Sequence, residues 1–332
     1  MGQLIKLQDY VSRYEQDIYH YSSQFVRLKK QQWNKLKIDY VDGNINDWLI
    51  GAESSESSGK MDESIKKRQL PEKFRKLVNR IKREQLPIPI QEEQAVARHE
   101  QELGRFLKSL PRTESDLKQQ FLDRMYHFQL KWASSTIREK SMVNANYIYD
   151  QRLRYFLQRF PDTCLILYKP VFQLKNAPVE LDIVMITPTE IWCLTFLEAE
   201  EEAVFLAEKG RFWTRRHHNR ADKKVLNPYL SINRMERIIT RILTSREIDM
   251  PIRKGILCRN GYIDDVNNSR TEMIIDKRSY TKWFEGMRNN QSPIKNQQLK
   301  SARALLDYCS TAYKIRMDLE EELEELDRES GF

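Results

Sequence analysis

The stretch VELDIVMITPTEIWCLTFL, residues 179–197, holds two short apolar runs rich in β-branched and aromatic residues, separated by the turn sequence Thr-Pro-Thr-Glu. Runs of this length and composition on either side of a turn predict two adjacent antiparallel strands. Asp182 lies inside the first run. A carboxylate among buried apolar residues is costly unless it is hydrogen-bonded, ion-paired or bound to a metal, so Asp182 is the first candidate site residue.

The segments around this strand pair predict an α/β domain. A helix is expected from Asn227 and Pro228, because Asn caps helices well and Pro fits the first helical turn. A second, short helix is expected at 279–287. An order of helix, three strands, helix and strand favours a sheet covered by helices. Further strands are expected at 164–168, 203–206, 251–258 and 272–275.

Residues 143–276 resemble the nuclease-related domain (NERD) family, a branch of the restriction-endonuclease-like PD-(D/E)XK superfamily. In that family one strand carries an Asp, and Glu-x-Lys follows after twelve residues on the next strand. Counted from Asp182, this pattern places Thr195 at the Glu position and Leu197 at the Lys position. The resemblance implies that the strand pair is present without its usual chemistry.

Three further motifs support the resemblance. Residues 210–213, Gly-Arg-Phe-Trp, resemble a short strand of the family that ends in an aromatic residue. Residues 227–230, Asn-Pro-Tyr-Leu, resemble its Asn-Pro helix start, with Ser231 where the family usually has Gln. The family opens its domain with a helix that carries Gly-Glu, and the counterpart here is Tyr149-Asp150. The implied fold class is α/β (α+β overall), with a restriction-endonuclease-like central mixed sheet flanked by helices.

The acids that remain are candidates for a former catalytic site. Asp182, Asp150 and Glu180 are the catalytic remnants that the resemblance implies, and Asp182 and Asp150 are the candidate metal ligands. Glu180 and Asp182 are two residues apart, so on one strand they would share a face. An active member would use Mg²⁺ or Mn²⁺ held by two acids. Because Thr195 and Leu197 supply neither a carboxylate nor an ammonium group, we expect no cofactor and no hydrolysis.

The charge distribution favours a partner with phosphate groups. The net charge is +8, but residues 318–329 carry eight acids and one base, so the rest of the chain carries +15. A basic body of this kind suits DNA or RNA, and a solvated helix that keeps the protein soluble explains the acidic segment equally well. The predicted phosphate contacts are a cluster of six cations: Arg211, Arg215, Arg216, Arg220, Lys223 and Lys224.

Helices are predicted on both sides of the nuclease-related region, which we place at 141–290. Residues 1–140 form a helical region, since apolar residues recur at intervals of three and four through 3–38 and again through 113–160. A Ser-, Gly- and Glu-rich flexible loop is expected near 50–65. At 291–332 a coiled-coil-like acidic helix is expected to run to about residue 329.

The sequence therefore predicts a catalytically inactive nuclease-related module that binds nucleic acid or protein. One alternative is an active metal-dependent nuclease with relocated ligands, in which a bulge brings Glu198 into the site. Another is a structural protein that pairs with itself through its long helices. No run of about 18 apolar residues and no apolar signal core occur, so we expect a cytoplasmic protein with no membrane partner.

Overall fold

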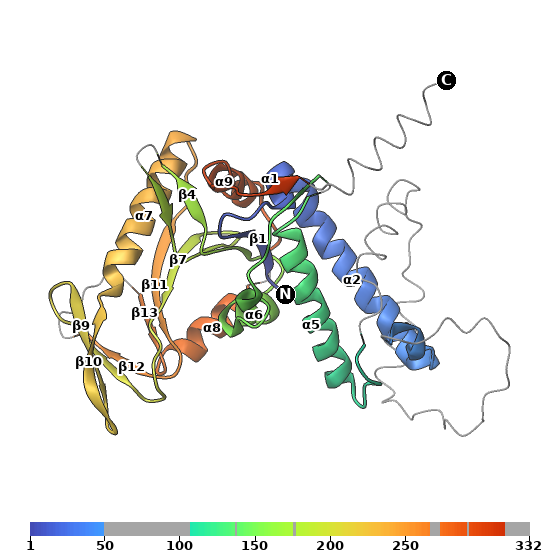
Figure 1. Cartoon of the computed structure of the whole chain (residues 1–332), viewed down its shortest axis with the longest axis horizontal. Coiled ribbons are helices and arrows are strands. Elements are labelled where there is room, and N and C mark those ends of the chain that lie inside the picture. The colour runs from blue at the N-terminus through green and yellow to red at the C-terminus, as the bar shows by residue number, and fades with distance from the viewer. Residues whose placement is uncertain (50–106, 137, 175–176, 266–272, 291, 316–332) are drawn as a thin grey trace. The chain divides into compact units, whose positions relative to one another are not determined.

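The computed structural model describes residues 1–49, 107–136, 138–174, 177–265, 273–290 and 292–315 (Figure 1). The chain divides into two compact units. One unit combines Met1–Tyr21 with Gln129–Phe332, and the other is Ser22–Phe128. The larger unit contains every strand of the central sheet, so the candidate site lies in it.

A six-stranded mixed sheet forms the centre of the larger unit, which confirms an α/β architecture with a mixed sheet. The two middle pairings, β3 with β6 and β6 with β7, are antiparallel, as predicted for the last two strands. The outer pairings are parallel, β1 with β3, β7 with β11, and β11 with β13. In spatial order the strands are β1 (Gln3–Leu7), β3 (Leu165–Tyr168), β6 (Ile183–Ile186), β7 (Ile191–Phe196), β11 (Ile252–Cys258) and β13 (Met273–Asp276).

Helices cover both faces of this sheet, because its strands are apolar on both sides. Helices α6 (Gln151–Arg159) and α8 (Tyr280–Arg288) lie on one face, where the Phe196 ring of β7 contacts Phe156 and the Trp192 ring contacts Trp283. Strand residues alternate between faces, so Cys193 and Thr195 point to the other face.

The opposite face carries α7 (Pro228–Ser245) and α9 (Asn296–Leu306). Helix α7 begins as predicted, since the Asn227 side chain accepts a hydrogen bond from the Tyr229 N–H and Pro228 occupies the first turn. Its buried stripe packs on β7 and β11 and consists of Ile232, Met235, Ile239, Ile242 and Leu243.

A second, four-stranded sheet packs beside the first. An apolar cluster joins it to α7 and β11, with Trp213 and Phe205 facing Ile232, Ile256 and Leu197. Its strands, in spatial order, are β10 (Arg220–Leu226), β9 (Phe212–His217), β8 (Val204–Leu206) and β12 (Tyr262–Asp264). Two small strand pairs complete the unit: β4 (Val171–Gln173) with β5 (Pro178–Glu180), and β2 (Glu139–Lys140) with β14 (Lys314–Ile315).

The smaller unit contains most of α2 (Ile18–Asp42) and α5 (Glu114–Trp132), with the 3₁₀ turn η1 (Ile45–Trp48). The Trp33 and Phe121 rings lie 5.1 Å apart and join these two helices. None of the helices in the described ranges combines the length and the hydropathy that a membrane span requires.

The predicted helix through 3–38 is wrong at its start. Residues Gln3–Leu7 form the buried strand β1, and only after α1 (Arg13–Gln16) does the long helix α2 begin. All five residues of β1 are buried, so pairing with β3 overrides the local spacing of Leu4 and Leu7 that suggested a helix. Ser12 stops the extended segment, because it caps α1 in a capping box with Glu15.

The predicted helix through 113–160 is also interrupted. Helix α5 ends at Trp132, where the Ser134 and Ser135 hydroxyl groups donate hydrogen bonds to the Leu130 and Lys131 carbonyl groups. Strand β2 and the 3₁₀ turn η2 (Ala145–Tyr147) follow before α6 begins. These side-chain bonds offer the backbone an alternative to helix, which periodicity alone does not reveal.

The predicted C-terminal coiled coil is wrong over 307–315. Helix α9 ends at Leu306, and the chain then pairs with earlier segments: the Ser310 N–H donates to the Val171 carbonyl group and the Ala312 N–H to that of Asp9. A continuous helix to residue 329 is therefore excluded. The loop expected near 50–65 and the acidic segment 318–329 lie outside the described residues.

A buried ion pair fastens β1 to these terminal segments. The Lys6 ammonium group is fully buried and contacts the Glu15 carboxylate, the Tyr10 carbonyl oxygen at 2.8 Å and the Thr311 hydroxyl group at 3.1 Å. The Thr311 hydroxyl group also donates to Glu15 at 2.9 Å. Among the described residues, Glu15 is thus the carboxylate that neutralises the charge on Lys6.

We predict that Glu15→Gln lowers the free energy of unfolding by about 3 kcal/mol, because a buried charge loses its partner while Gln preserves the capping box. Urea denaturation measures the change. Arg253→Gln breaks the exposed pair with Glu190 and serves as the control, with an expected loss of about 0.5 kcal/mol. Equal losses in the two variants would contradict this role for the Lys6 pair.

Candidate functional site

Asp182 lies directly before β6, half-buried, at the point where α7 meets the sheet. Its carboxylate accepts a hydrogen bond of 2.7 Å from the Ser231 hydroxyl group in the first turn of α7. Ile183 pairs with Leu194, so the same antiparallel register places Asp182 opposite Thr195. The structure therefore brings together two of the positions that the resemblance assigns to the site, Asp182 and Ser231, and sets a third, Thr195, opposite Asp182.

The chemistry of the facing strand is neutral. Thr195 is buried, with 8% of its surface exposed, and offers only a hydroxyl group. Leu197 belongs to the apolar cluster with Trp213 and Ile232, where its side chain packs against carbon atoms. No carboxylate or ammonium group stands at either position, so Asp182 is the one acid of the expected motif on this strand pair.

Asp150 has a structural role that the sequence did not show. It caps α6, with one carboxylate oxygen accepting the Arg152 and Leu153 N–H groups at 2.9 and 3.0 Å. The other oxygen accepts the Tyr168 hydroxyl group at 2.9 Å. Burial, helped by the Asp150 charge, raises the pKa of Tyr168 above its ordinary value, so the phenol stays a hydrogen-bond donor. Both oxygens of Asp150 are thus used by the fold.

The expectation that Glu180 shares a strand face with Asp182 is wrong. Glu180 is the last residue of β5, which pairs with β4, whereas Asp182 precedes β6 of the central sheet. The chain passes from one sheet to the other between these two residues. There the Leu181 N–H donates a hydrogen bond to the Pro170 carbonyl group, and the Lys169 N–H donates one to the Asp182 carbonyl group. The Glu180 side chain is exposed, and its own carbonyl group accepts a bond from Arg234.

Metal binding at Asp182 and Asp150 stays a prediction. Over the described ranges, no three His, Cys, Asp or Glu side chains gather closely enough to hold a metal ion. A hard divalent cation such as Mg²⁺ is usually held by at least one or two carboxylates with water or phosphate oxygens completing its shell. Asp182 supplies a single carboxylate, already bonded to Ser231.

Glu198, the candidate relocated ligand, faces away from this site. It follows β7 with Phe196 on the α6 face and forms a bidentate ion pair with Arg259, the longer contact measuring 3.1 Å. Arg152 of α6 approaches the same carboxylate at 3.4 Å. Both guanidinium groups also lie over the Phe196 ring, that of Arg152 at 4.9 Å and that of Arg259 at 5.1 Å from the ring centroid. Two cations therefore hold Glu198 on the opposite face of the sheet from Ser231.

Four of the six predicted phosphate contacts form ion pairs, with three carboxylates between them. Glu200 pairs with both Arg215 and Arg220. A hydrogen bond from its own backbone, together with these two cations, holds the pKa of Glu200 below its ordinary value. The remaining pairs are Arg216 with Asp222 and Lys224 with Glu208.

Arg211 and Lys223 differ from the other four cations. Both are exposed, and Arg211 lies over the Phe212 ring at 5.9 Å. Neither has an ion pair within the part of the chain that the structure describes. Of the predicted cluster, these two are the cations without an acidic partner among the described residues.

Helix α7 carries a row of exposed arginines, here called the basic stripe, that was not predicted from the sequence. Arg234, Arg237 and Arg241 are exposed and follow the spacing i, i+3, i+7, so they share one side of the helix. Among the described residues, no acid pairs with Arg237 or Arg241. The stripe begins three residues after Ser231. The sequence did contain a signal for this stripe, because the three arginines recur at helical spacing between the apolar residues of α7.

Comparison with known proteins assigns no family. No family model matches the chain. No solved structure matches it. A segment of 37 residues is 62% identical to an RNA 2′,3′-cyclic phosphodiesterase of Geobacillus stearothermophilus. That match covers 11% of this chain and 12% of the relative, so the chain spans a small part of the relative's length.

We predict that Ser231 and Asp182 are energetically coupled. Ser231→Ala and Asp182→Ala should each destabilise the protein, and a double-mutant cycle should give a coupling of about 1 to 2 kcal/mol, as for a hydrogen bond to a charged group. Chemical denaturation of the four proteins measures it. Strictly additive losses would show that the bond contributes nothing to the junction of α7 with the strand pair.

Proposed function

We propose that this chain contains a nuclease-related core of the PD-(D/E)XK type that binds nucleic acid without cleaving it. The order of elements supports the proposal: an opening helix α6, the antiparallel pair β6 and β7, and the Asn-Pro helix α7 follow in the sequence that the resemblance implies. The hydrogen bond between Asp182 and Ser231 supports it further, since it joins the residues at the family's Asp and Gln positions.

The composition of the site argues against hydrolysis. Metal-assisted cleavage of a phosphodiester requires a held divalent cation to stabilise the charge that develops in the transition state. Loss of one preorganised electrostatic group costs about 3 to 4 kcal/mol of transition-state stabilisation, and here two groups are replaced, by Thr195 and Leu197. The relocated-ligand alternative has less support, because Arg259 and Arg152 hold Glu198 on the far face.

The observation that carries the binding proposal is the basic stripe of α7. Arg237 and Arg241 are exposed and have no acidic partner within the described ranges, and the helix that presents them starts at the site. Exposed arginines in a row suit the regularly spaced phosphates of a nucleic acid backbone. Arg211 and Lys223 on the neighbouring sheet are the candidates for further contacts.

The dependence of affinity on salt concentration distinguishes a nucleic acid partner from a protein partner. Phosphate binding releases counterions and weakens steeply as salt rises, irrespective of base sequence. Binding of a folded protein has no such fixed dependence. Self-association through long helices is the third possibility; α2 and α5 are still available for it, but the expected continuous helix to residue 329 is not.

We predict that the full chain binds fluorescein-labelled oligonucleotides with a salt-dependent affinity, and that Arg237→Glu/Arg241→Glu weakens binding about tenfold or more. Fluorescence anisotropy with single-stranded and duplex DNA and RNA measures the dissociation constant. Arg237→Lys/Arg241→Lys keeps both charges and is the matched control. The same double reversal should reduce the slope of log affinity against log salt by about 2.

Two outcomes would overturn the proposal. Absence of binding to every oligonucleotide at low salt would remove the nucleic-acid partner. Cleavage of the oligonucleotide in Mg²⁺ or Mn²⁺ by the native chain, lost in Asp182→Ala, would establish the active-nuclease alternative instead.

A further inference from the structure

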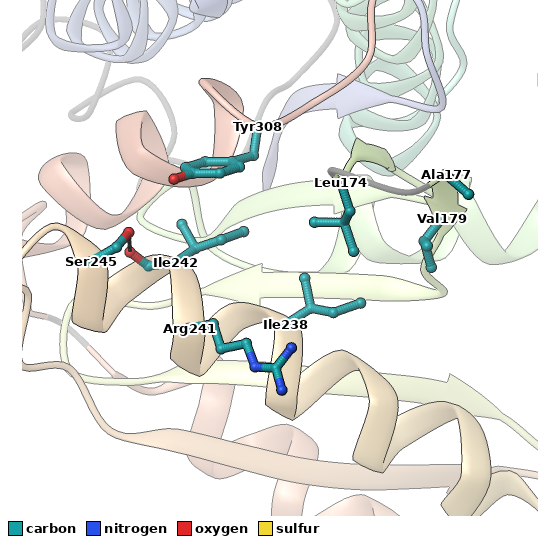
Figure 2. Close-up of a pocket in the computed structure, with 8 residues that line it drawn as sticks. All are labelled: Leu174, Ala177, Val179, Ile238, Arg241, Ile242, Ser245 and Tyr308. Atoms are coloured by element: carbon teal, nitrogen blue, oxygen red, sulfur yellow. Dashed lines mark hydrogen bonds between the residues drawn. The ribbon is translucent and has the colours of Figure 1, made fainter.

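A groove of about 510 Å³ lies beside α7 in the larger unit, and Asp182 is not among the residues that line it (Figure 2). Its apolar wall comes from Ile238 and Ile242 of α7 and from Leu174 and Val179 at the β4–β5 hairpin. Tyr308, just after α9, closes the far side. A concave apolar surface of this size suits several aliphatic side chains.

Cationic and polar groups border this apolar wall. Arg241 lines the groove, and Arg237 lies one turn before it on the same side of α7. The Tyr308 hydroxyl group makes no hydrogen bond to the parts of the chain that the structure describes. Ser245 is already satisfied, because its hydroxyl group donates to the Ile242 carbonyl oxygen at 2.7 Å. The groove therefore fits a partner that is apolar along one side and anionic beside it.

This chain contains such a segment. Residues 318–329 have the sequence DLEEELEELDRE, with leucines at 319, 323 and 326 and a net charge of −7. The leucine spacing i, i+4, i+7 is that of one apolar helix face, and the acids fill the positions between. Both properties of the segment complement the groove: its leucines match Ile238 and Ile242, and its acids match Arg237 and Arg241.

The segment is long enough to reach the groove. Tyr308 lines the groove and Ile315 follows it by seven residues, so Ile315 lies at most about 25 Å away. Leu323 follows Ile315 by eight residues, which span up to about 28 Å when extended. Leu323 and the residues after it can therefore return to α7 of the same chain.

We propose that residues 318–329, the acidic segment, dock into this groove of their own chain. Leu323 and Leu326 occupy the apolar wall, and Glu324 and Glu325 face Arg237 and Arg241. A docked acidic segment covers two arginines of the basic stripe. Competition with nucleic acid for these arginines is a consequence that rests on the proposed function, whereas docking itself does not.

Photo-crosslinking in the full chain tests the docking. A chain with p-benzoylphenylalanine at position 323 should crosslink to groove peptides that contain Ile238, Ile242 or Val179, as read by mass spectrometry. The same group at position 321, two residues away on the opposite side of a helix, is the control and should give little of this product. Mixing ¹⁴N- and ¹⁵N-labelled chains distinguishes docking within one chain from docking onto a second copy.

Charge-reversal variants provide a second test of the docking. Arg237→Glu/Arg241→Glu should lower the crosslink yield about fivefold or more, and Glu324→Lys/Glu325→Lys, outside the described core, should lower it similarly. Combining the two pairs of changes should restore the yield, which misfolding of either variant would not allow.

Three results would overturn the docking: unchanged yields after both reversals, crosslinks that map outside the groove, or crosslinks that mix the two isotopes in the statistical proportion expected for docking onto a second copy. Oligonucleotide affinity in the Glu324→Lys/Glu325→Lys variant reports separately on competition. If no oligonucleotide binds, the proposed function fails while the crosslinks still decide the docking.

Discussion

The hydrogen bond from the Ser231 hydroxyl group to the Asp182 carboxylate fixes the start of α7 against the central strand pair. A half-buried carboxylate has to be satisfied, and here a helix supplies the partner. The Asn227 cap sets where the helix begins, and its buried stripe then lies along β7 and β11. The orientation of α7 in turn determines where its exposed arginines lie. One polar contact thus links the candidate site to the basic stripe.

In the proposed function, the same contact favours binding over hydrolysis. Asp182 accepts its hydrogen bond from a neutral donor, Ser231. On the facing strand, Thr195 supplies only a hydroxyl group, and Leu197 packs in an apolar cluster. Asp150 stabilises the start of α6, and Glu198 is held by two arginines on the other face. Each acid that a metal site would need is committed to the fold, while the arginines of α7 remain exposed.

The sequence predicted the elements whose signals are local. The strand pair around Asp182, the Asn227 cap and the helix after Ser279 are set by short-range pattern, and the structure has all three. Strand β1 was missed because it pairs with β3 across some 160 residues, and the Lys6 pair that holds it involves Thr311 near the other end. The roles of Asp150 and Glu198 also depend on distant partners, Tyr168 and Arg259. The spacing of the arginines on α7 could have predicted the basic stripe, but only the apolar pattern of that helix was used.

Calorimetric titration of Mn²⁺ into the native chain, beside the Asp182→Ala variant, tests the central claim most directly. The account predicts no saturable binding that depends on Asp182, because a single carboxylate bonded to Ser231 gives a hard cation too few charged oxygen ligands. Micromolar Mn²⁺ binding by the native chain that disappears in Asp182→Ala would contradict it, since it would show that a complete metal site survives beside α7.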